Sequence, residues 1–127
     1  RVNADGCHLG QKDMDILKAK KILKNKIIGV TCHNSIKLAK YASSNGANYI
    51  ALGAFYKTRT KKVIHKADIR TLSKIKKSIK IPVVAIGGIN EKNYKKLLLN
   101  KADFLAISGY IWNNKKFKPH QAIKNLI

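Results

Sequence analysis

The feature that most constrains the fold is a strand–helix repeat, in which a short apolar run and a longer lysine-rich segment of helical period recur about every 25 residues. The run at residues 83–86, VVAI, is apolar at every position, which is typical of a parallel strand covered on both faces. Strands that alternate with helices form βαβ units with right-handed crossovers. The sequence therefore predicts an α/β protein with a parallel sheet.

The repeat predicts five strands and five main helices. The expected strands are residues 5–9, 26–31, 48–53, 82–87 and 103–108. The expected helices are residues 13–24, 35–44, 68–78, 91–99 and a last one near 120–127. Asp13, Asn34 and Asn90 stand at expected helix N-caps, and Gly46 stands at an expected C-cap. No linker or low-complexity tract divides the chain, so we expect one domain or part of one.

The length of 127 residues leaves two architectures open. A complete (β/α)8 barrel needs roughly 200–250 residues, so five strand–helix units would form only part of one. A small, open, doubly wound sheet would also accommodate them. The first residues contain no Met and no apolar signal segment, which is typical of the middle of a longer protein.

The charge is strongly positive, with 27 Lys and Arg against 6 Asp and Glu and a net charge of +21. Of these cations 24 are lysines, and they are spread over every expected helix. Nucleic-acid-binding surfaces are instead rich in clustered arginine, so a non-enzymatic nucleic-acid-binding module is kept only as an alternative. A positive field also favours anionic small substrates. No run approaches the roughly 18 apolar residues of a membrane helix, so no membrane partner is expected.

Two Cys-His pairs, Cys7-His8 and Cys32-His33, suggest a zinc site at first sight. Consecutive side chains of a strand point to opposite faces, so such pairs do not readily close on one metal ion. Core packing and polar contacts at the strand ends are the better interpretation. Two cysteines also form no disulfide framework, which favours a reducing compartment and hence a cytoplasmic location.

Glycines follow the last two expected strands, as Gly87-Gly88 and as Ser108-Gly109. Glycine lets backbone N–H groups approach an anion closely, and a helix N-terminus adds partial positive charge. Barrels commonly bind phosphate at the loops after strands seven and eight. Each motif alone could be a tight turn, but the pair on consecutive strands favours a phosphate site.

Three further segments carry candidate site residues at strand ends. Thr58 and Thr60, followed by Lys61, could donate hydrogen bonds and charge to phosphate, although a solvated basic loop has the same composition. Asp13 lies just beyond the first strand, where it is either a ligand or a helix N-cap. Thr31 and His33 flank the end of the second strand and face the same edge.

Five motifs in order resemble the thiamine-phosphate synthase family. They are residues 5–13 (DGCHLGQKD), 27–34 (IIGVTCHN), 46–53 (GANYIALG) with the TRTK of 58–61, 81–89 (IPVVAIGGI) and 102–108 (ADFLAIS). Together they cover almost the whole chain. The resemblance implies a partial TIM (β/α)8 barrel, from about the fourth strand to the eighth with their helices.

The resemblance also implies a function in thiamine biosynthesis, as a Mg²⁺-dependent transferase. Hydroxymethylpyrimidine diphosphate would be joined to thiazole phosphate with release of pyrophosphate. By position, Asp13 matches a Mg²⁺ ligand, Thr31 a serine that touches the pyrimidine, and Lys61 the lysine on the diphosphate. The residues that match the thiazole-phosphate contacts are Thr58 and Thr60, with Arg59 between them, Gly88, Ile107 and Ser108.

Departures from the family pattern keep an alternative open. Lys57 stands where the family usually has proline, and Thr31 replaces a serine but keeps its hydroxyl. The family's other metal-binding aspartate and its Gln-x-Arg-x-Lys segment would precede Arg1, so the chain alone is expected to be inactive and either poorly stable or oligomeric. A thiazole tautomerase-like relative would instead use His33, although the motifs around Asp13 and Thr58 favour the synthase.

Overall fold

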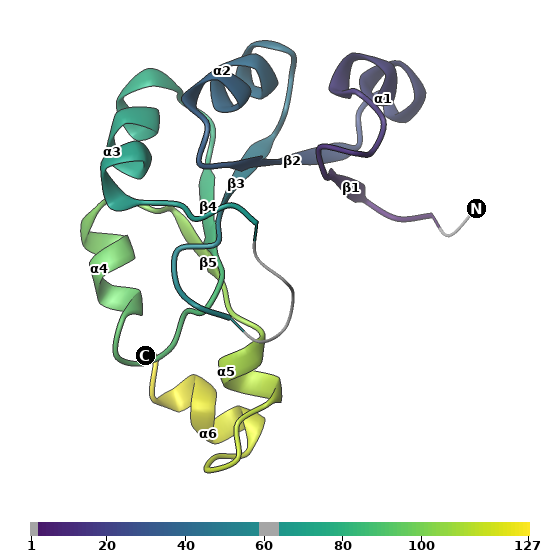
Figure 1. Cartoon of the computed structure of the whole chain (residues 1–127). Coiled ribbons are helices and arrows are strands. Elements are labelled where there is room, and N and C mark those ends of the chain that lie inside the picture. Colours follow the sequence, from purple (N-terminus) through teal and green to yellow (C-terminus); the bar gives the residue numbers. More distant parts are fainter. Residues whose placement is uncertain (1–2, 59–63) are drawn as a thin grey trace.

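The computed structural model describes residues 3–58 and 64–127 and contains one parallel sheet (Figure 1). Its strands are β1 (Gly6–Leu9), β2 (Ile27–His33), β3 (Tyr49–Gly53), β4 (Val83–Ile86) and β5 (Phe104–Ala106). Its helices are α1 (Ile16–Leu23), α2 (Ile36–Ser44), α3 (Ile69–Ser78), α4 (Tyr94–Leu99), α5 (Gly109–Trp112) and α6 (Pro119–Lys124). Every expected strand and main helix is present, with ends that differ by a few residues.

The order of the strands decides between the two architectures left open by the sequence. Neighbouring strands pair in parallel in the order β1-β2-β3-β4-β5, which is also their order in the chain. A doubly wound sheet reverses its order and carries helices on both faces. Figure 1 instead shows α1 to α4 on the outer side of a curved sheet. The fold is therefore a partial (β/α) barrel, and the doubly wound alternative is wrong.

Three expected helix N-caps are wrong, and the C-cap of α2 is Asn45, one residue before the expected Gly46. The observed N-cap positions are Asp15, Ser35 and Asn93, in place of Asp13, Asn34 and Asn90. The expected residues bond elsewhere; Asn34, for example, exchanges two hydrogen bonds of 3.0 Å with Asp68, the N-cap of α3. Gly46 has a φ of +88° after α2, and the N–H groups of Gly46 and Ala47 bond back to Ser43 and Ala42 in a Schellman motif.

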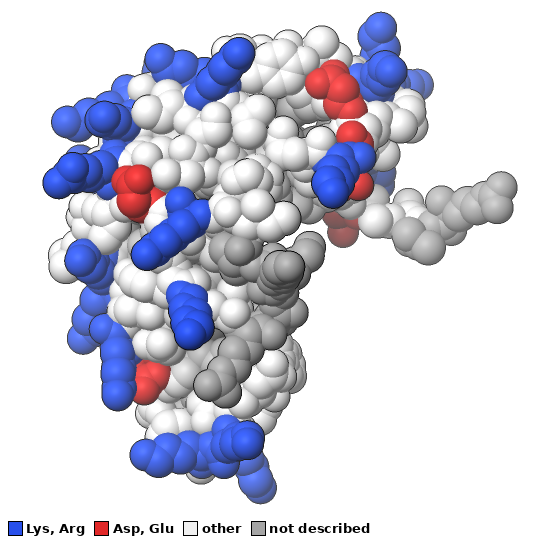
Figure 2. Space-filling view, in the orientation of Figure 1, with Lys and Arg blue, Asp and Glu red and all other residues white. Residues whose placement is uncertain are grey.

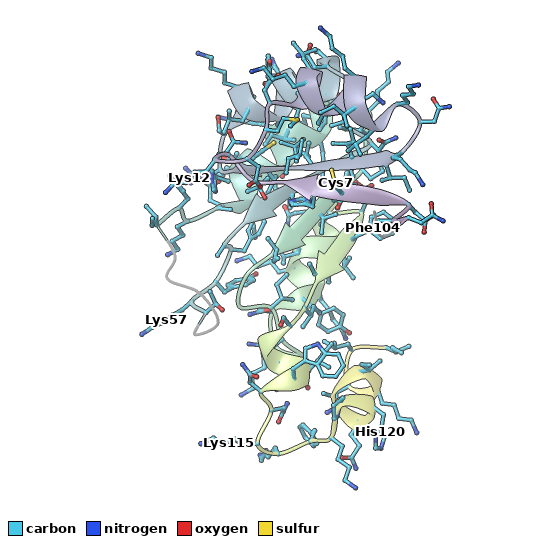
Figure 3. The ribbon with its side chains drawn as sticks, turned by 90° about the vertical axis from the view of Figure 1, so that its right-hand side faces the viewer. Cys7, Lys12, Lys57, Phe104, Lys115 and His120 are labelled. Atoms are coloured by element: carbon cyan, nitrogen blue, oxygen red, sulfur yellow. The ribbon has the colours of Figure 1, made fainter. Side chains whose placement is uncertain are left out.

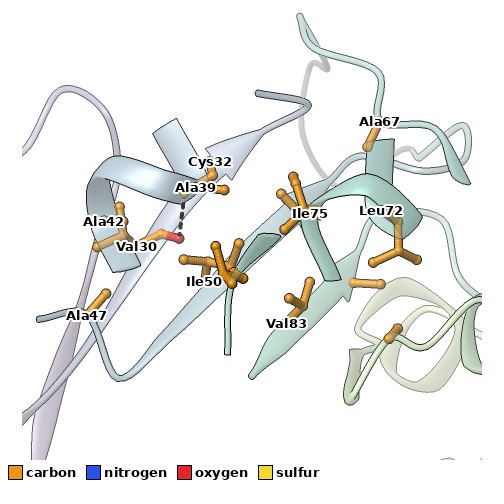
Figure 4. Packing of buried hydrophobic residues seen from close by; sticks show 14 of the residues in the cluster. Val30, Cys32, Ala39, Ala42, Ala47, Ile50, Ala67, Leu72, Ile75 and Val83 are labelled. Atoms are coloured by element: carbon orange, nitrogen blue, oxygen red, sulfur yellow. Dashed lines mark hydrogen bonds between the residues drawn. The ribbon is translucent and has the colours of Figure 1, made fainter. Parts of the chain in front are cut away.

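The hydrophobic core lies between the sheet and its helices (Figure 4). Ile50, Leu72, Ile75 and Val83 are fully buried in it. Cys32 also points into this core, where its thiol contacts the Val30 carbonyl and burial raises its pKa to about 12. Because Cys32 faces the helices, it shares no site with its neighbour His33. Among the described residues, no three His, Cys, Asp or Glu side chains are placed to hold a metal ion.

The opposite, concave face of the sheet carries exposed apolar side chains. Alternation along the strands places Ile27, Ile86 and Phe104 on this face, and they are 51%, 44% and 60% exposed. Figure 3 shows Phe104 at the start of β5. A barrel would bury such residues in its interior. In the part of the chain that the structure describes, no helix is long and apolar enough to cross a bilayer.

Candidate active site

The carboxyl ends of all five strands meet at one edge of the sheet, because all of the strands are parallel and pair in register. The described loops at this edge are residues 10–15, 34–35, 54–58, 64–68, 87–93 and 107–108. The described candidate site residues lie in these loops or at the strand ends beside them; they are Asp13, Thr31, His33, Thr58, Gly88, Ile107 and Ser108. Lys12 and Lys57 extend from this side of the molecule (Figure 3), whereas other lysines are scattered over the helices (Figure 2).

The loop after β3 is locked against the glycine pair after β4. The N–H groups of Phe55 and Tyr56 donate to the carbonyls of Ile86 and Gly87 at 3.1 and 3.0 Å. Gly87 and Gly88 have φ values of +102° and +63°, and a Cβ atom on Gly88 would overlap the Lys57 carbonyl oxygen. The glycines thus make a tight turn and also permit close approach of the Thr58 loop.

A network around Asn93 fixes the glycine loop. Its side-chain amide donates to the Gly88 carbonyl at 3.0 Å, and its amide oxygen accepts from the Asn90 N–H at 2.9 Å. The Tyr56 hydroxyl donates to the Asn93 carbonyl at 3.3 Å, which joins the loops after β3 and β4 a second time. The sequence did not predict this role, because Asn93 was expected inside a helix over residues 91–99 and is instead the N-cap of a shorter one.

The remaining candidate phosphate contacts lie nearby or outside the described residues. Ser108 is the residue before α5 and makes no side-chain cap hydrogen bond, while Ile107 packs against the core. Thr58 lines a cavity of about 380 Å³ together with Tyr56 and two lysines, Lys57 and Lys66. Arg59, Thr60 and Lys61 fall outside the residues that the structure describes, so their predicted roles stay predictions.

Asp13 is not the N-cap of α1, because Asp15 accepts from the Leu17 N–H at 2.9 Å and takes that position. The carboxylate oxygen Oδ2 of Asp13 accepts a hydrogen bond from the Gly10 N–H at 2.7 Å. The backbone N–H of Asp13 donates to the Gly10 carbonyl at 3.1 Å. Within residues 3–58 and 64–127, no donor bonds to its other oxygen, Oδ1. Mg²⁺ is usually held by one or two carboxylates together with substrate phosphates and waters, and an anchored carboxylate with an available oxygen fits that mode.

Thr31 is held by two side chains that the sequence analysis did not single out as site residues. The hydroxyl of Thr31 lies 2.8 Å from Nε2 of His8, and the side chain of Gln11 donates to the Thr31 carbonyl. Nδ1 of His8 lies 3.0 Å from the Tyr49 hydroxyl. Partial burial lowers the pKa of His8, and the nearby Asp13 carboxylate offsets only part of this shift. The lowered pKa favours the neutral form of His8 at pH 7.

His33 stands at the end of β2 with a φ of +52°, and its ring contacts that of His65 with centroids 4.1 Å apart. Burial lowers the pKa of His33, and the neighbouring His65 lowers it further. The Ala54 N–H donates to the His65 carbonyl at 3.1 Å, so the loop after β3 returns to this edge. Sequence patterns did not single out His65, because it lies in a loop of no regular period.

Comparison with known proteins identifies the family. The family model described as thiamine monophosphate synthase matches residues 1–111. The chain belongs to this family. A thiamine-phosphate synthase from Pelagibacter ubique (strain HTCC1062) is 69% identical over 126 residues, 99% of this chain and 61% of that protein. One from Clostridium acetobutylicum is 46% identical over 118 residues, 92% of this chain and 56% of that protein.

Solved structures agree with the family match. Thiamine phosphate pyrophosphorylase from Pyrococcus furiosus superposes with a TM-score of 0.83 at 37% identity, over 98% of this chain and 58% of that chain. A 3-hexulose-6-phosphate synthase superposes with a TM-score of 0.71 at 19% identity, which shows a common fold alone. This chain of the thiamine monophosphate synthase family thus spans less than two thirds of the length of these relatives.

Because the loops after β3 and β4 are hydrogen-bonded together, Gly88→Ala should destabilise the protein more than Gly46→Ala, although both glycines have a positive φ. Gly46→Ala should lower the free energy of unfolding by about 1–2 kcal/mol, the cost of a left-handed alanine, because its Cβ meets only the flexible end of Lys20. Gly88→Ala should cost about 1–3 kcal/mol more, because its Cβ meets backbone. Urea denaturation measures both values.

Amide NMR spectra give a second readout for the same pair of variants. Gly88→Ala should move the amide signals of Phe55 and Tyr56, whose hydrogen bonds join the two loops, and Gly46→Ala should leave them in place. Equal losses of stability with unmoved loop signals would contradict the close approach of the two loops.

Proposed function

We propose that this chain supplies the last five strand–helix units, about strands four to eight, of a single thiamine-phosphate synthase barrel. Its sequential parallel order and its exposed apolar concave face support this assignment. The shorter length of the chain relative to the Pelagibacter and Pyrococcus proteins supports it as well. Further strands would cover Ile27, Ile86 and Phe104 and pair with β1 and β5.

The proposed reaction joins hydroxymethylpyrimidine diphosphate to thiazole phosphate and releases pyrophosphate. The observation that carries this proposal is the locked pair of loops, in which Gly88 lies against the segment that leads into Thr58. In this numbering the glycine loop after β4 would follow strand seven and Ser108 would follow strand eight, and the loops after these two strands are where barrels commonly bind phosphate. The thiazole phosphate would lie between Gly88, Ile107-Ser108 and the loop of Thr58, Arg59 and Thr60.

The chemistry follows from the leaving group. As the pyrimidine CH₂–O bond breaks, negative charge develops on the pyrophosphate oxygens, and the Lys61 side chain would stabilise this charge. The Thr31 hydroxyl would hold the pyrimidine while the thiazole nitrogen attacks the CH₂ carbon. Bound Mg²⁺ would neutralise part of the developing charge. Asp13 would hold that ion through Oδ1, because Gly10 already occupies Oδ2.

The proposed surroundings of the enzyme follow from its charge and its thiols. Both cysteines are free in the structure, which supports a reducing, cytoplasmic location. On the face shown in Figure 2 the lysines are scattered over the surface, which favours small anionic substrates over nucleic acid as partners.

The activity can be tested by joining this chain to the part of the Pelagibacter synthase that precedes its matched region. With both substrates and Mg²⁺, the joined protein should form thiamine phosphate and pyrophosphate in equal amounts. The 127-residue chain alone should form neither, because its sheet has two open edges and an uncovered face. A folded joined protein without activity, or an equally active chain alone, would contradict the proposal.

The metal role of Asp13 predicts a difference between two neighbouring aspartates in the joined protein. Asp13→Asn keeps an oxygen for the Gly10 N–H but removes the charge, so half-maximal rate should need at least about tenfold more Mg²⁺. Asp15→Asn is the matched control, because asparagine caps a helix about as well as aspartate. It should leave the Mg²⁺ requirement unchanged. The same Mg²⁺ dependence in the unsubstituted protein, Asp13→Asn and Asp15→Asn would contradict the metal role and leave Asp13 with a structural role in its loop.

A further inference from the structure

Three polar side chains from neighbouring strands form a hydrogen-bonded series across the concave face. The Tyr49 hydroxyl of β3 lies 3.0 Å from Nδ1 of His8 in β1, and Nε2 of His8 lies 2.8 Å from the Thr31 hydroxyl of β2. The rings of His8 and Tyr49 are 5.5 Å apart between centroids. The series thus ends on the one hydroxyl that the proposed function assigns to the pyrimidine substrate.

A glycine in the middle strand makes this series possible. Gly29 pairs in register with His8 on one side and with Tyr49 on the other. A Cβ atom on Gly29 would overlap the phenol ring of Tyr49, so the ring crosses β2 directly over this glycine. Tyr49 therefore reaches past its nearest strand to bond a side chain two strands away.

Thr31 is also fixed from its backbone side. The Gln11 side chain donates to its carbonyl, and Thr31 pairs in register with Ala51 of β3. The regular register ends directly after this pair, between Thr31 and His33. The His8 contact places the Thr31 hydroxyl oxygen, so the direction of the Thr31 O–H bond depends on whether His8 donates or accepts in this hydrogen bond.

The direction of the hydrogen bonds follows from the acidity of the groups. A neutral imidazole carries one N–H, and the partner of each ring nitrogen decides which nitrogen is protonated. A phenol is more acidic than an aliphatic hydroxyl and is the better donor, so the Tyr49 O–H donates to Nδ1 of His8. The proton of His8 then lies on Nε2 and is donated to the Thr31 oxygen. The Thr31 proton is left to point away from His8.

We propose that Tyr49 is a positioning residue, which fixes His8 as its Nε2–H tautomer and thereby leaves Thr31 as a hydrogen-bond donor to the pyrimidine substrate. The tautomer is a property of the chain itself, whereas the identity of the substrate rests on the proposed function. The two parts can therefore fail separately.

The first test is an imidazole ¹H–¹⁵N correlation spectrum of the labelled joined protein at pH 8, with the His8 signals assigned by loss in His8→Gln. The wild-type joined protein should show His8 as the Nε2–H tautomer. Tyr49→Phe keeps the ring but removes the donor, so the His8 signals should shift toward a mixture of tautomers. Tyr41→Phe is the matched control, because its hydroxyl donates to Asp15 on the helix side of the sheet at 3.0 Å, and it should leave His8 unchanged.

Two results of this spectrum would overturn the proposal. One is an Nδ1–H tautomer of His8 in the wild-type joined protein, and the other is an unshifted His8 in Tyr49→Phe. Gly29→Ala forces the Tyr49 ring off β2, and it should reproduce the effect of Tyr49→Phe if the contact sets the tautomer. Unaltered His8 signals in a folded Gly29→Ala protein would also count against it.

The second test uses the joined synthase and separates positioning from general stability. Tyr49→Phe should lower kcat/KM for the pyrimidine diphosphate about tenfold and leave the KM for thiazole phosphate unchanged. Because Tyr49 acts through Thr31, combining Tyr49→Phe with Thr31→Val should be no worse than Thr31→Val alone. Additive losses, or an equal loss for both substrates, would overturn the positioning role. A joined protein with no synthase activity would contradict the proposed function. The His8 spectrum would still show whether Tyr49 fixes the tautomer of His8.

Discussion

Parallel pairing of the five strands in chain order is the constraint on which the rest of the structure depends. This pairing places the carboxyl ends of all five strands at the same edge of the sheet. Residues as far apart in sequence as Asp13 and Ser108 therefore belong to one set of loops. The pairing also divides the sheet into two faces with different tasks. The side chains toward the helices form an apolar core, and those on the concave face carry the polar series of Tyr49, His8 and Thr31.

At two glycines, neighbouring parts of the chain pack directly against the backbone, and this packing determines how the residues of the candidate site lie relative to one another. Gly88 lets residues 56 and 57 come against the loop after β4, and Gly29 lets the phenol of Tyr49 cross β2. At both positions a methyl group would occupy space that a neighbouring strand or loop fills. The lack of a side chain at these two glycines therefore shapes the site as much as the polar groups that would contact a substrate.

The elements could be predicted from the sequence, because apolar period and turn residues are local properties. The strand–helix pattern alone could not decide the order of the strands, since five units fit an open doubly wound sheet equally well. The resemblance to the thiamine-phosphate synthase family implied a partial barrel, and the observed order of the strands confirms it. The N-caps were misplaced by one to three residues, because several residues that can cap stand close together before each helix. Asp13, for example, bonds back to Gly10 and leaves the cap to Asp15.

Candidate site residues could be predicted where one segment of the sequence carries a motif. They were missed where the site depends on contacts between side chains of three different strands. The pair Gly87-Gly88 is visible in the sequence, whereas the role of His8 depends on Tyr49, Gly29 and the register that joins them.

The most direct test is an amide NMR titration of the joined protein with thiazole phosphate, with the dephosphorylated thiazole alcohol as control. The account predicts that only the phosphate shifts the signals of Thr58, Gly88, Ser108 and Gly109. Shifts confined to the lysine-rich helices, or equal shifts with the alcohol, would contradict it.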